Sequence, residues 1–99
     1  MTIETERTEE MLLLRLEGRL DTNTAPQLQE VLDNMLEDIK ELQIDMERLE
    51  YVTSAGLRIL LATMKKMKAG GGSMTVRHVN SAVMEVFNIT GFKRYLDIR

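Results

Sequence analysis

The alternation of hydrophobic and polar residues predicts strands in five parts of the chain. In residues 11–18 (MLLLRLEG), Leu12, Leu14 and Leu16 occupy every second position, which is typical of a strand with one buried face. The more polar segment 2–7 (TIETER) is expected to pair with this strand through a turn near residues 8–10. The other predicted strands are 41–46 (ELQIDM), 73–79 (SMTVRHV) and 94–98 (RYLDI).

A hydrophobic stripe at helical spacing predicts a first helix between the second and third strands. Its apolar positions begin at Leu28 and continue to Ile39. Thr24 is the expected N-cap, and Gln27 stands three residues later, as in a capping box. Pro26 falls in the first turn, where its missing N–H is tolerated.

Two further helices are predicted in the second half of the chain. One runs from about residue 54 to 68, with apolar residues at every third or fourth position and Gly70 just past its end. The other begins with Asn80 or Ser81 as its N-cap and stops at Gly91.

The predicted order of elements is β-β-α-β-α-β-α-β. Strands separated by helices favour right-handed crossovers and parallel pairing, while the first two strands add an antiparallel hairpin. We therefore expect one α/β domain over residues 1–99, built on a mostly parallel sheet. Its core is expected to include Leu14, Leu16, Leu32, Ile44, Leu60, Leu61, Val76 and Phe87.

Polar residues follow several of the predicted strands. Because the carboxyl ends of parallel strands meet at one edge of a sheet, the loops that leave them gather there. This edge is expected to carry Asp21, Thr22, Asn23, Thr53, Ser54, Asn80 and Ser81. The adjacent hydroxyls of Thr53 and Ser54 would then stand at a helix N-terminus, where free N–H groups and the helix dipole favour an oxygen acceptor or an anion.

Three roles are open to these two hydroxyls. They can cap the helix, because serine and threonine are favoured N-caps. Ser54 can also accept a phosphate, and Arg58 lies four residues later, where it can pair with one. A nucleophilic serine is disfavoured: Val52 stands where a hydrolase elbow needs glycine, and the only histidine, His78, is predicted within a strand.

Composition argues against several other classes of protein. The net charge of −3 and the absence of tryptophan disfavour nucleic-acid binding, and the cations from Arg58 to Lys68 are interpreted as a solvated helix face. No cysteine is present, which fits a reducing cytoplasm, and a single histidine disfavours a metal centre. There is no apolar run long enough to span a membrane and no signal-peptide pattern at the start. The stretch 69–73 (AGGGS) lacks the ending of a phosphate-binding loop, so we interpret it as a turn.

Four segments, in this order, resemble the STAS-domain anti-sigma factor antagonists of bacteria. They are LEGRLDTNTAPQL (16–28), YVTSAGLRILL (51–61), KAGGGSMTV (68–76) and VFNITGF (86–92). The resemblance extends over nearly the whole chain. It implies a binding protein and not an enzyme, with no cofactor.

The resemblance also implies a mechanism. In this family the unphosphorylated antagonist captures an anti-sigma factor that is also a serine kinase, which frees a sigma factor. The kinase then phosphorylates the serine that opens the second helix, and a phosphatase resets the protein. That serine matches Ser54, and Asp21 matches the family's acidic residue beside it. The partner-binding edge would comprise Asp21, Thr22, Asn23, Thr53, Ser54, Ala55, Gly56 and Arg58.

The sequence departs from well-studied members at two positions. Thr53 stands where they often carry aspartate, and Ala55 where they often carry serine or threonine. Thr53 is therefore an alternative acceptor. A second function also stays open, that of a STAS scaffold or ligand-sensing module of a larger signalling or transport assembly. The absence of a fused segment favours the first function.

Overall fold

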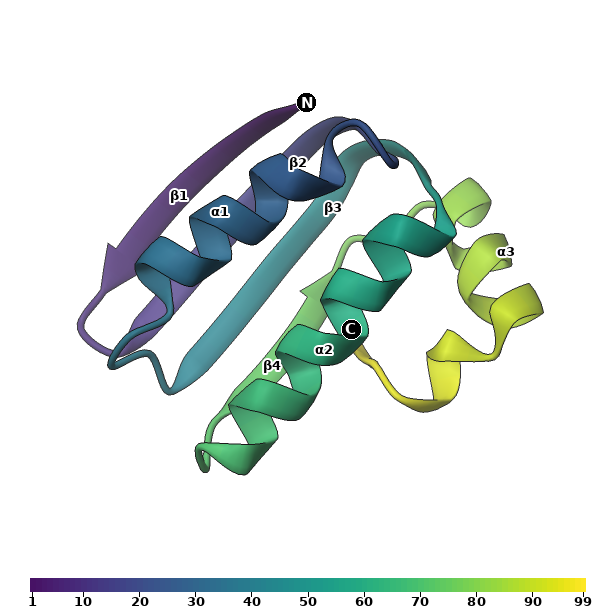
Figure 1. Cartoon of the computed structure of the whole chain (residues 1–99). Coiled ribbons are helices and arrows are strands. Elements are labelled where there is room, and N and C mark those ends of the chain that lie inside the picture. Colours follow the sequence, from purple (N-terminus) through teal and green to yellow (C-terminus); the bar gives the residue numbers. More distant parts are fainter.

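The computed structural model describes all residues 1–99, and five strands in it form one sheet in the order β1-β2-β3-β4-β5 (Figure 1). The first pair is antiparallel, and every other neighbouring pair is parallel. This confirms the predicted mostly parallel sheet with an N-terminal hairpin. The strands are β1 (Thr2–Thr8), β2 (Met11–Leu20), β3 (Glu41–Val52), β4 (Ser73–Arg77) and β5 (Asp97–Ile98).

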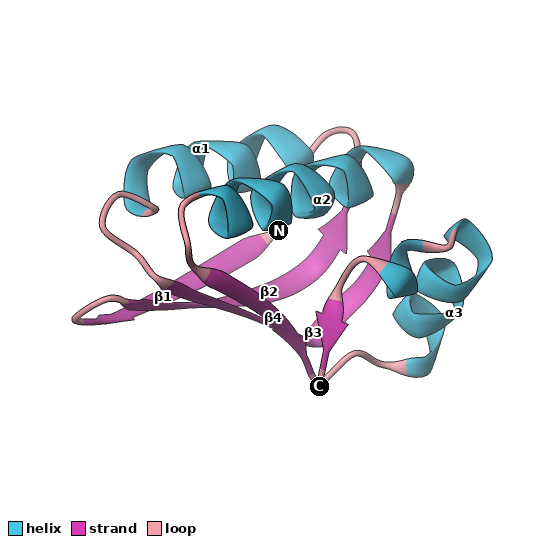
Figure 2. Cartoon of the chain, turned by 90° about the horizontal axis from the view of Figure 1, so that it is seen from below, coloured by secondary structure: helices cyan, strands magenta, loops and turns pink.

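The helices alternate with the parallel strands, as predicted. They are α1 (Ala25–Met35), α2 (Ser54–Ala69) and α3 (Ser81–Thr90), and a 3₁₀ turn covers Phe92–Arg94. Figure 2 shows α1 and α2 side by side on one face of the sheet and α3 to one side, so the other face has no helix over it. None of these helices combines the length and hydrophobicity required to cross a membrane.

The core lies between the sheet and the covering helices α1 and α2, and α3 adds Val83 and Phe87 to it. Leu14, Ile44, Leu60, Val76 and Phe87 are fully buried, as the alternation and helical spacing predicted. Leu16 and Leu32 are buried as well. Leu61 is a correction: it is only partly buried and packs at the margin of the core, because it lies one residue around the helix from the fully buried Leu60.

The first helix is shorter than predicted and begins differently. It ends at Met35 with Leu36 as its C-cap, and Asp38 then turns the chain with a left-handed φ of 66°. Ile39 is still buried, but it enters the core from this turn and not from the helix. Thr24 is the N-cap position, yet its side chain makes no capping hydrogen bond, and Gln27 donates to the Met1 carbonyl. The predicted capping box is therefore wrong.

Several strand boundaries also differ from the prediction. β3 continues to Val52, six residues beyond the predicted strand, and its register with β2 shifts twice. β4 ends at Arg77, so His78 lies outside the strand with a left-handed φ of 57°. β5 contains only two residues because the chain after Gly91 first makes the 3₁₀ turn.

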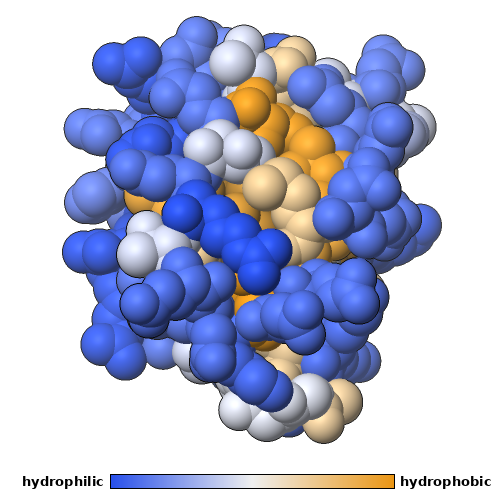
Figure 3. Space-filling model, turned by 90° about the vertical axis from the view of Figure 1, so that its left-hand side faces the viewer, coloured by the Kyte–Doolittle hydropathy of each residue, from blue (hydrophilic) through white to orange (hydrophobic).

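The edge strand β1 extends beyond the cover of the helices. Nearly all its residues are exposed; Ile3, which pairs with Leu16 on the helix-facing side, is partly buried. On this side of the molecule, Figure 3 shows a strip of apolar atoms between hydrophilic side chains. β1 and α1 contribute the partly buried residues Ile3, Val31 and Met35.

Candidate functional site

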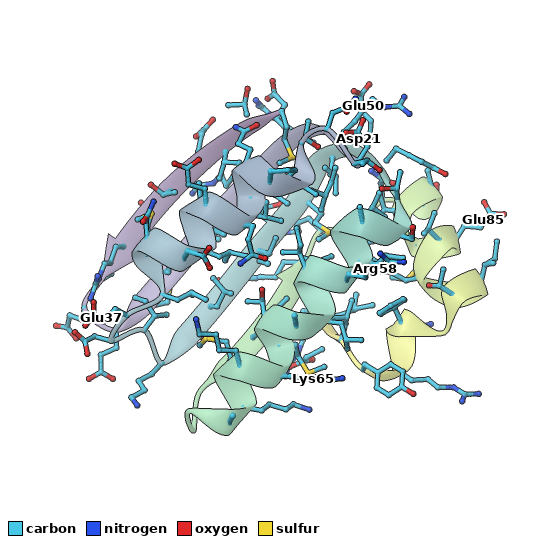
Figure 4. The ribbon with its side chains drawn as sticks, in the orientation of Figure 1. Asp21, Glu37, Glu50, Arg58, Lys65 and Glu85 are labelled. Atoms are coloured by element: carbon cyan, nitrogen blue, oxygen red, sulfur yellow. The ribbon has the colours of Figure 1, made fainter.

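The carboxyl ends of β2 and β3 form the edge that the sequence predicted. Leu20 and Val52 are partners in the last pair of this register, so both strands end at the same level. The N–H of Thr53 donates to the Leu20 carbonyl over 2.9 Å, which ties the start of α2 to the residue before Asp21. Figure 4 shows Asp21 at this edge and Arg58 in the N-terminal part of α2.

The loop between β2 and α1 is held together by Asp21 and Thr24. One oxygen of Asp21, Oδ1, accepts hydrogen bonds from the N–H groups of Asn23 (2.9 Å) and Thr24 (3.1 Å). The Thr24 hydroxyl donates to the Arg19 carbonyl over 2.7 Å and accepts from the Asp21 N–H over 2.9 Å. Thr24 therefore closes this loop in place of capping α1, while Thr22 and Asn23 stay exposed.

These bonds also set the acidity of Asp21. The hydrogen bond from the Thr24 N–H is the main reason that the pKa of the Asp21 carboxyl lies below its ordinary value of 3.8. Desolvation acts in the opposite direction, and the Asn23 N–H, the Thr24 hydroxyl and the charge of Arg19 each lower the pKa further. A hydrogen bond to the ionised form favours that form. Asp21 is therefore a carboxylate at neutral pH and brings one negative charge to the edge.

The hydroxyls of Thr53 and Ser54 do not cap α2. Thr53 occupies the N-cap position with an extended backbone, but its side chain makes no capping hydrogen bond. Its Oγ1 is buried and has no hydrogen-bond partner. Ser54 is the first helical residue and is exposed, and its hydroxyl makes no hydrogen bond within the chain. Capping by side chains, one of the roles weighed from the sequence, is thus not what these residues do.

The first turn of α2 consequently presents free donors. The N–H groups of Ser54, Ala55 and Gly56 find no acceptor within the chain, whereas the N–H of Leu57 bonds to the Thr53 carbonyl over 3.0 Å. No acidic residue stands in this turn. Such an N-terminus carries a partial positive charge that favours an anion.

The remaining predicted members of the edge lie in this turn or directly after it. Ala55 is half-buried, and Gly56 is buried against the sheet. Arg58 is exposed and forms no ion pair or hydrogen bond within the chain. The five main hollows on the surface are lined by other residues, so this site is an exposed edge and not a pocket.

Asn80 and Ser81 lie beside this edge in a way that the sequence did not predict. β4 ends at Arg77, opposite Asp45, seven residues before β3 ends. The chain then starts α3 alongside the last part of β3, where the Asn80 side chain donates to the Leu49 carbonyl and accepts from the Val83 N–H. Asn80, one of the two expected caps, is thus confirmed as the N-cap of α3.

The only histidine is far from the two hydroxyls. His78 lies beside Asp45, and the seven strand residues from there to Val52 span roughly 20 Å. The imidazole is therefore not placed to serve as a general base for Ser54.

Sequence reasoning missed one pair at this edge. Arg19 and Tyr51 are partners in the β2–β3 register, and the guanidinium carbon of Arg19 lies 5.4 Å from the centre of the Tyr51 ring. Tyr51 remains 41% exposed, directly before Val52 and Thr53. Exposed tyrosine and arginine are common in binding surfaces. Arg19 and Tyr51 face each other because of the second register shift between β2 and β3. The sequence carries no signal of that shift, so it could not have revealed the pair.

The fold and this edge match a known family. Residues 2–99 match the family model of the STAS domain. The chain belongs to the STAS domain family. The family resemblance described from the sequence is thereby confirmed, and the site described above is the edge of a STAS domain.

Two relatives of this STAS domain are named as anti-sigma-B factor antagonists of bacteria. The chain is 29% identical over 98 residues to the anti-sigma-B factor antagonist of Bacillus subtilis, covering 99% of this chain and 90% of the relative. It is 27% identical over 99 residues to the anti-sigma-B factor antagonist of Staphylococcus aureus strain NCTC 8325, covering 99% and 92%.

Solved structures share the fold. An anti-sigma factor antagonist from Mycobacterium paratuberculosis superposes with a TM-score of 0.86 at 26% identity, over 98% of this chain and 83% of that one. The Bacillus cell fate determinant SpoIIAA in its phosphorylated form superposes with a TM-score of 0.77 at 21% identity, over 99% and 91%.

Proposed function

We propose that this STAS domain is an anti-sigma factor antagonist of a partner-switching pathway in the cytoplasm. In its unphosphorylated form it binds an anti-sigma factor that has serine kinase activity. That kinase phosphorylates Ser54, the complex dissociates, and a serine phosphatase restores the binding form. The observation that carries this proposal is the Ser54 hydroxyl, which is exposed on the first residue of α2 and has no structural hydrogen bond.

The N-terminal turn of α2 suits a phosphoserine. The free N–H groups of residues 54–56 and the absence of an acidic residue favour a negative charge there. Arg58 lies one helical turn further on and has no other partner, so it can pair with the phosphate. Phosphorylation would therefore be tolerated by the fold, and its effect would fall on a docked partner.

The same edge provides a reason for release. A phosphate adds about −1.5 to −2 charges at neutral pH. Asp21 already brings a carboxylate to the edge. A partner that fits a neutral hydroxyl beside one carboxylate would then meet two like-charged groups, which disfavours docking.

The relatives support this reading. The Bacillus subtilis and Staphylococcus aureus proteins are named as antagonists of an anti-sigma factor, and each matches this chain over nearly its whole length. SpoIIAA, whose fold this chain shares, has been solved in a phosphorylated form.

The test combines the purified protein with an anti-sigma factor encoded beside it and with ATP. Phosphate is mapped by mass spectrometry, and affinity is measured before and after modification. We expect phosphate on Ser54, none in Ser54→Ala, and weaker binding after modification. Ser81→Ala is the matched control, because Ser81 is also an exposed serine that opens a helix.

The outcomes separate the alternatives. We expect Ser54→Ala to keep binding to the anti-sigma factor, and Ser54→Asp to weaken it in part, since aspartate carries less charge than phosphate. Phosphate on Thr53 alone would identify the alternative acceptor. No phosphate and equal affinity throughout would contradict the switch and favour a scaffold or ligand-sensing module.

A further inference from the structure

Three side chains with metal-binding groups meet away from the edge just described. Asp45 and Glu47 come from β3, and His78 follows the end of β4. One ligand atom from each lies within 4.8 Å of the other two. The Nδ1 of His78 is 3.2 Å from the Asp45 Oδ1, and the imidazole is accessible, with 55% of its side chain exposed.

The backbone brings these residues together at one place. Asp45 and Arg77 form the last pair between β3 and β4, and His78 then turns out of the strand with a left-handed φ of 57°. On its other side β3 shifts register against β2 directly after Asp45, so the sheet is irregular where Glu47 lies. The Glu47 N–H donates to Asp45 Oδ1 over 2.9 Å and orients that carboxylate.

The two carboxylates are not paired with the arginines around them. The nearby arginines are directed to other groups: Arg15 pairs with Glu6, Arg48 with Glu17, and Arg77 donates to Gln43. No lysine or arginine forms an ion pair with Asp45 or Glu47. Asp45 and Glu47 therefore have no partner among the lysines and arginines and remain available to a bound cation.

We propose that Asp45, Glu47 and His78 form a binding site for a divalent first-row transition metal ion, with Zn²⁺ as the best match. Imidazole nitrogen and carboxylate oxygen are both zinc ligands. Two ligand atoms about 2.1 Å from an ion at a tetrahedral angle lie about 3.4 Å apart. The 3.2 Å between His78 Nδ1 and Asp45 Oδ1 is close to that spacing.

The donor set also selects against other ions. Mg²⁺ and Ca²⁺ prefer oxygen ligands alone, so the imidazole favours zinc, nickel, copper or iron. Three protein ligands leave at least one coordination position for water or for a group of another molecule. Binding would join the end of β4 to the middle of β3 and thereby stabilise the fold in proportion to metal concentration.

The site can be tested on the purified protein with ZnCl₂ alone. Zinc binding is followed by isothermal titration calorimetry and by the NMR signals of the His78 ring, which are unambiguous because the chain has one histidine and no cysteine. We expect one saturable ion per chain, a shift of the His78 signals, a rise in melting temperature with zinc, and no such effects with MgCl₂.

Two variants remove ligands and one serves as a control. His78→Gly deletes the imidazole at a backbone conformation that glycine adopts freely, so this variant should fold. His78→Gly and Glu47→Gln should each weaken zinc binding at least about tenfold. Glu50→Gln removes an exposed carboxylate from the same strand outside the cluster and should bind as the wild type does.

Two results would overturn the proposal. One is the absence of saturable zinc binding by the wild type. The other is unchanged binding in both ligand variants while circular dichroism shows that they are folded, which would mean adventitious binding elsewhere. Phosphorylation of Ser54 does not enter this experiment, so its outcome is independent of the proposed function.

Discussion

Gly56, in the first turn of α2, packs directly against Leu20 at the end of β2. A Cβ atom at position 56 would lie 2.5 Å from Cγ of Leu20 and 2.7 Å from its Cδ2, and 3.0 Å from Cγ2 of Val52. The two distances to Leu20 are shorter than non-bonded carbon atoms tolerate, and the distance to Val52 is tight. The absence of a side chain at position 56 is what allows α2 to start so close to the sheet, with Ser54 at the edge.

Gly56→Ala should therefore destabilise the protein by about 1–3 kcal/mol, because the helix or the Leu20 side chain must move. The measurement is urea unfolding followed by circular dichroism. Gly70→Ala, at the other end of the same helix, is the control: its Cβ would meet nothing closer than 3.6 Å. Equal stability of both variants would show that the packing at residue 56 is loose.

Thr53→Val should leave stability unchanged or raise it by up to about 1 kcal/mol. The Thr53 Oγ1 is buried without a partner, and replacing an unsatisfied hydroxyl with a methyl of the same shape removes a desolvation penalty. The free energy of unfolding in urea checks this. A loss of stability would mean that the hydroxyl has a partner after all.

Ser54→Ala should change the free energy of unfolding by less than about 0.5 kcal/mol. The serine hydroxyl is exposed and makes no hydrogen bond within the chain, and alanine is a good helix former. Chemical unfolding of the two proteins measures the difference. A substantially larger loss would restore a capping role for Ser54.

Asp21→Asn should alter how stability depends on pH. The pKa of Asp21 is below 3.8 in the folded protein, so the unfolded chain binds more protons in acid, and stability falls as pH drops. The ionised carboxylate stabilises the fold above the unfolded pKa, and this contribution is lost as pH falls through the folded pKa.

The comparison is made by urea unfolding of wild type and Asp21→Asn at a series of pH values. The stability difference should be constant near neutral pH and shrink as pH falls below 3.8. A difference that did not depend on pH would show that the charge of Asp21 is irrelevant to the loop. Asp97 also has a lowered pKa, so the stability of both proteins changes with pH for that reason as well. The contribution of Asp21 is therefore taken from the difference in stability between wild type and Asp21→Asn.

Asn80→Ala should destabilise the protein by about 1–3 kcal/mol. The Asn80 side chain accepts from the Val83 N–H and donates to the Leu49 carbonyl, so alanine leaves both groups without this partner. Asn80→Asp keeps the capping oxygen and loses only the donor. Its melting temperature should therefore lie between those of the wild type and Asn80→Ala. If alanine and aspartate had the same effect, the cap would contribute nothing.

Local patterns were sufficient for the order of elements and for most of the core. The alternation of Leu12, Leu14 and Leu16 and the stripe along residues 57–67 specify which face of each element is apolar. Any fold that buries these faces must put them together, so Leu14, Ile44 and Leu60 are fully buried as expected. The edge at residues 21 and 53–54 also follows, because parallel strands of consecutive units end on the same side.

The resemblance to a family, and not the periodicity, pointed to Ser54 as a phosphate acceptor. From the residues alone, capping and phosphate acceptance were both open. The conformation of the first turn of α2 decides against capping, and nothing in the identities of Thr53 and Ser54 could have shown that.

Only the tertiary structure decided that Asp45, Glu47 and His78 meet, because their meeting depends on the register and the length of the strands. The sequence argued against a metal centre because it offers one imidazole and no thiol. Whether Asp45 and Glu47 reach His78 depends on where β4 ends against β3, on the register shift that follows Asp45, and on a left-handed residue, none of which leaves a periodic signal. Periodicity records which side of an element is buried, whereas the meeting of polar groups from different strands is determined by how the strands are aligned, and that alignment exists only in the folded chain.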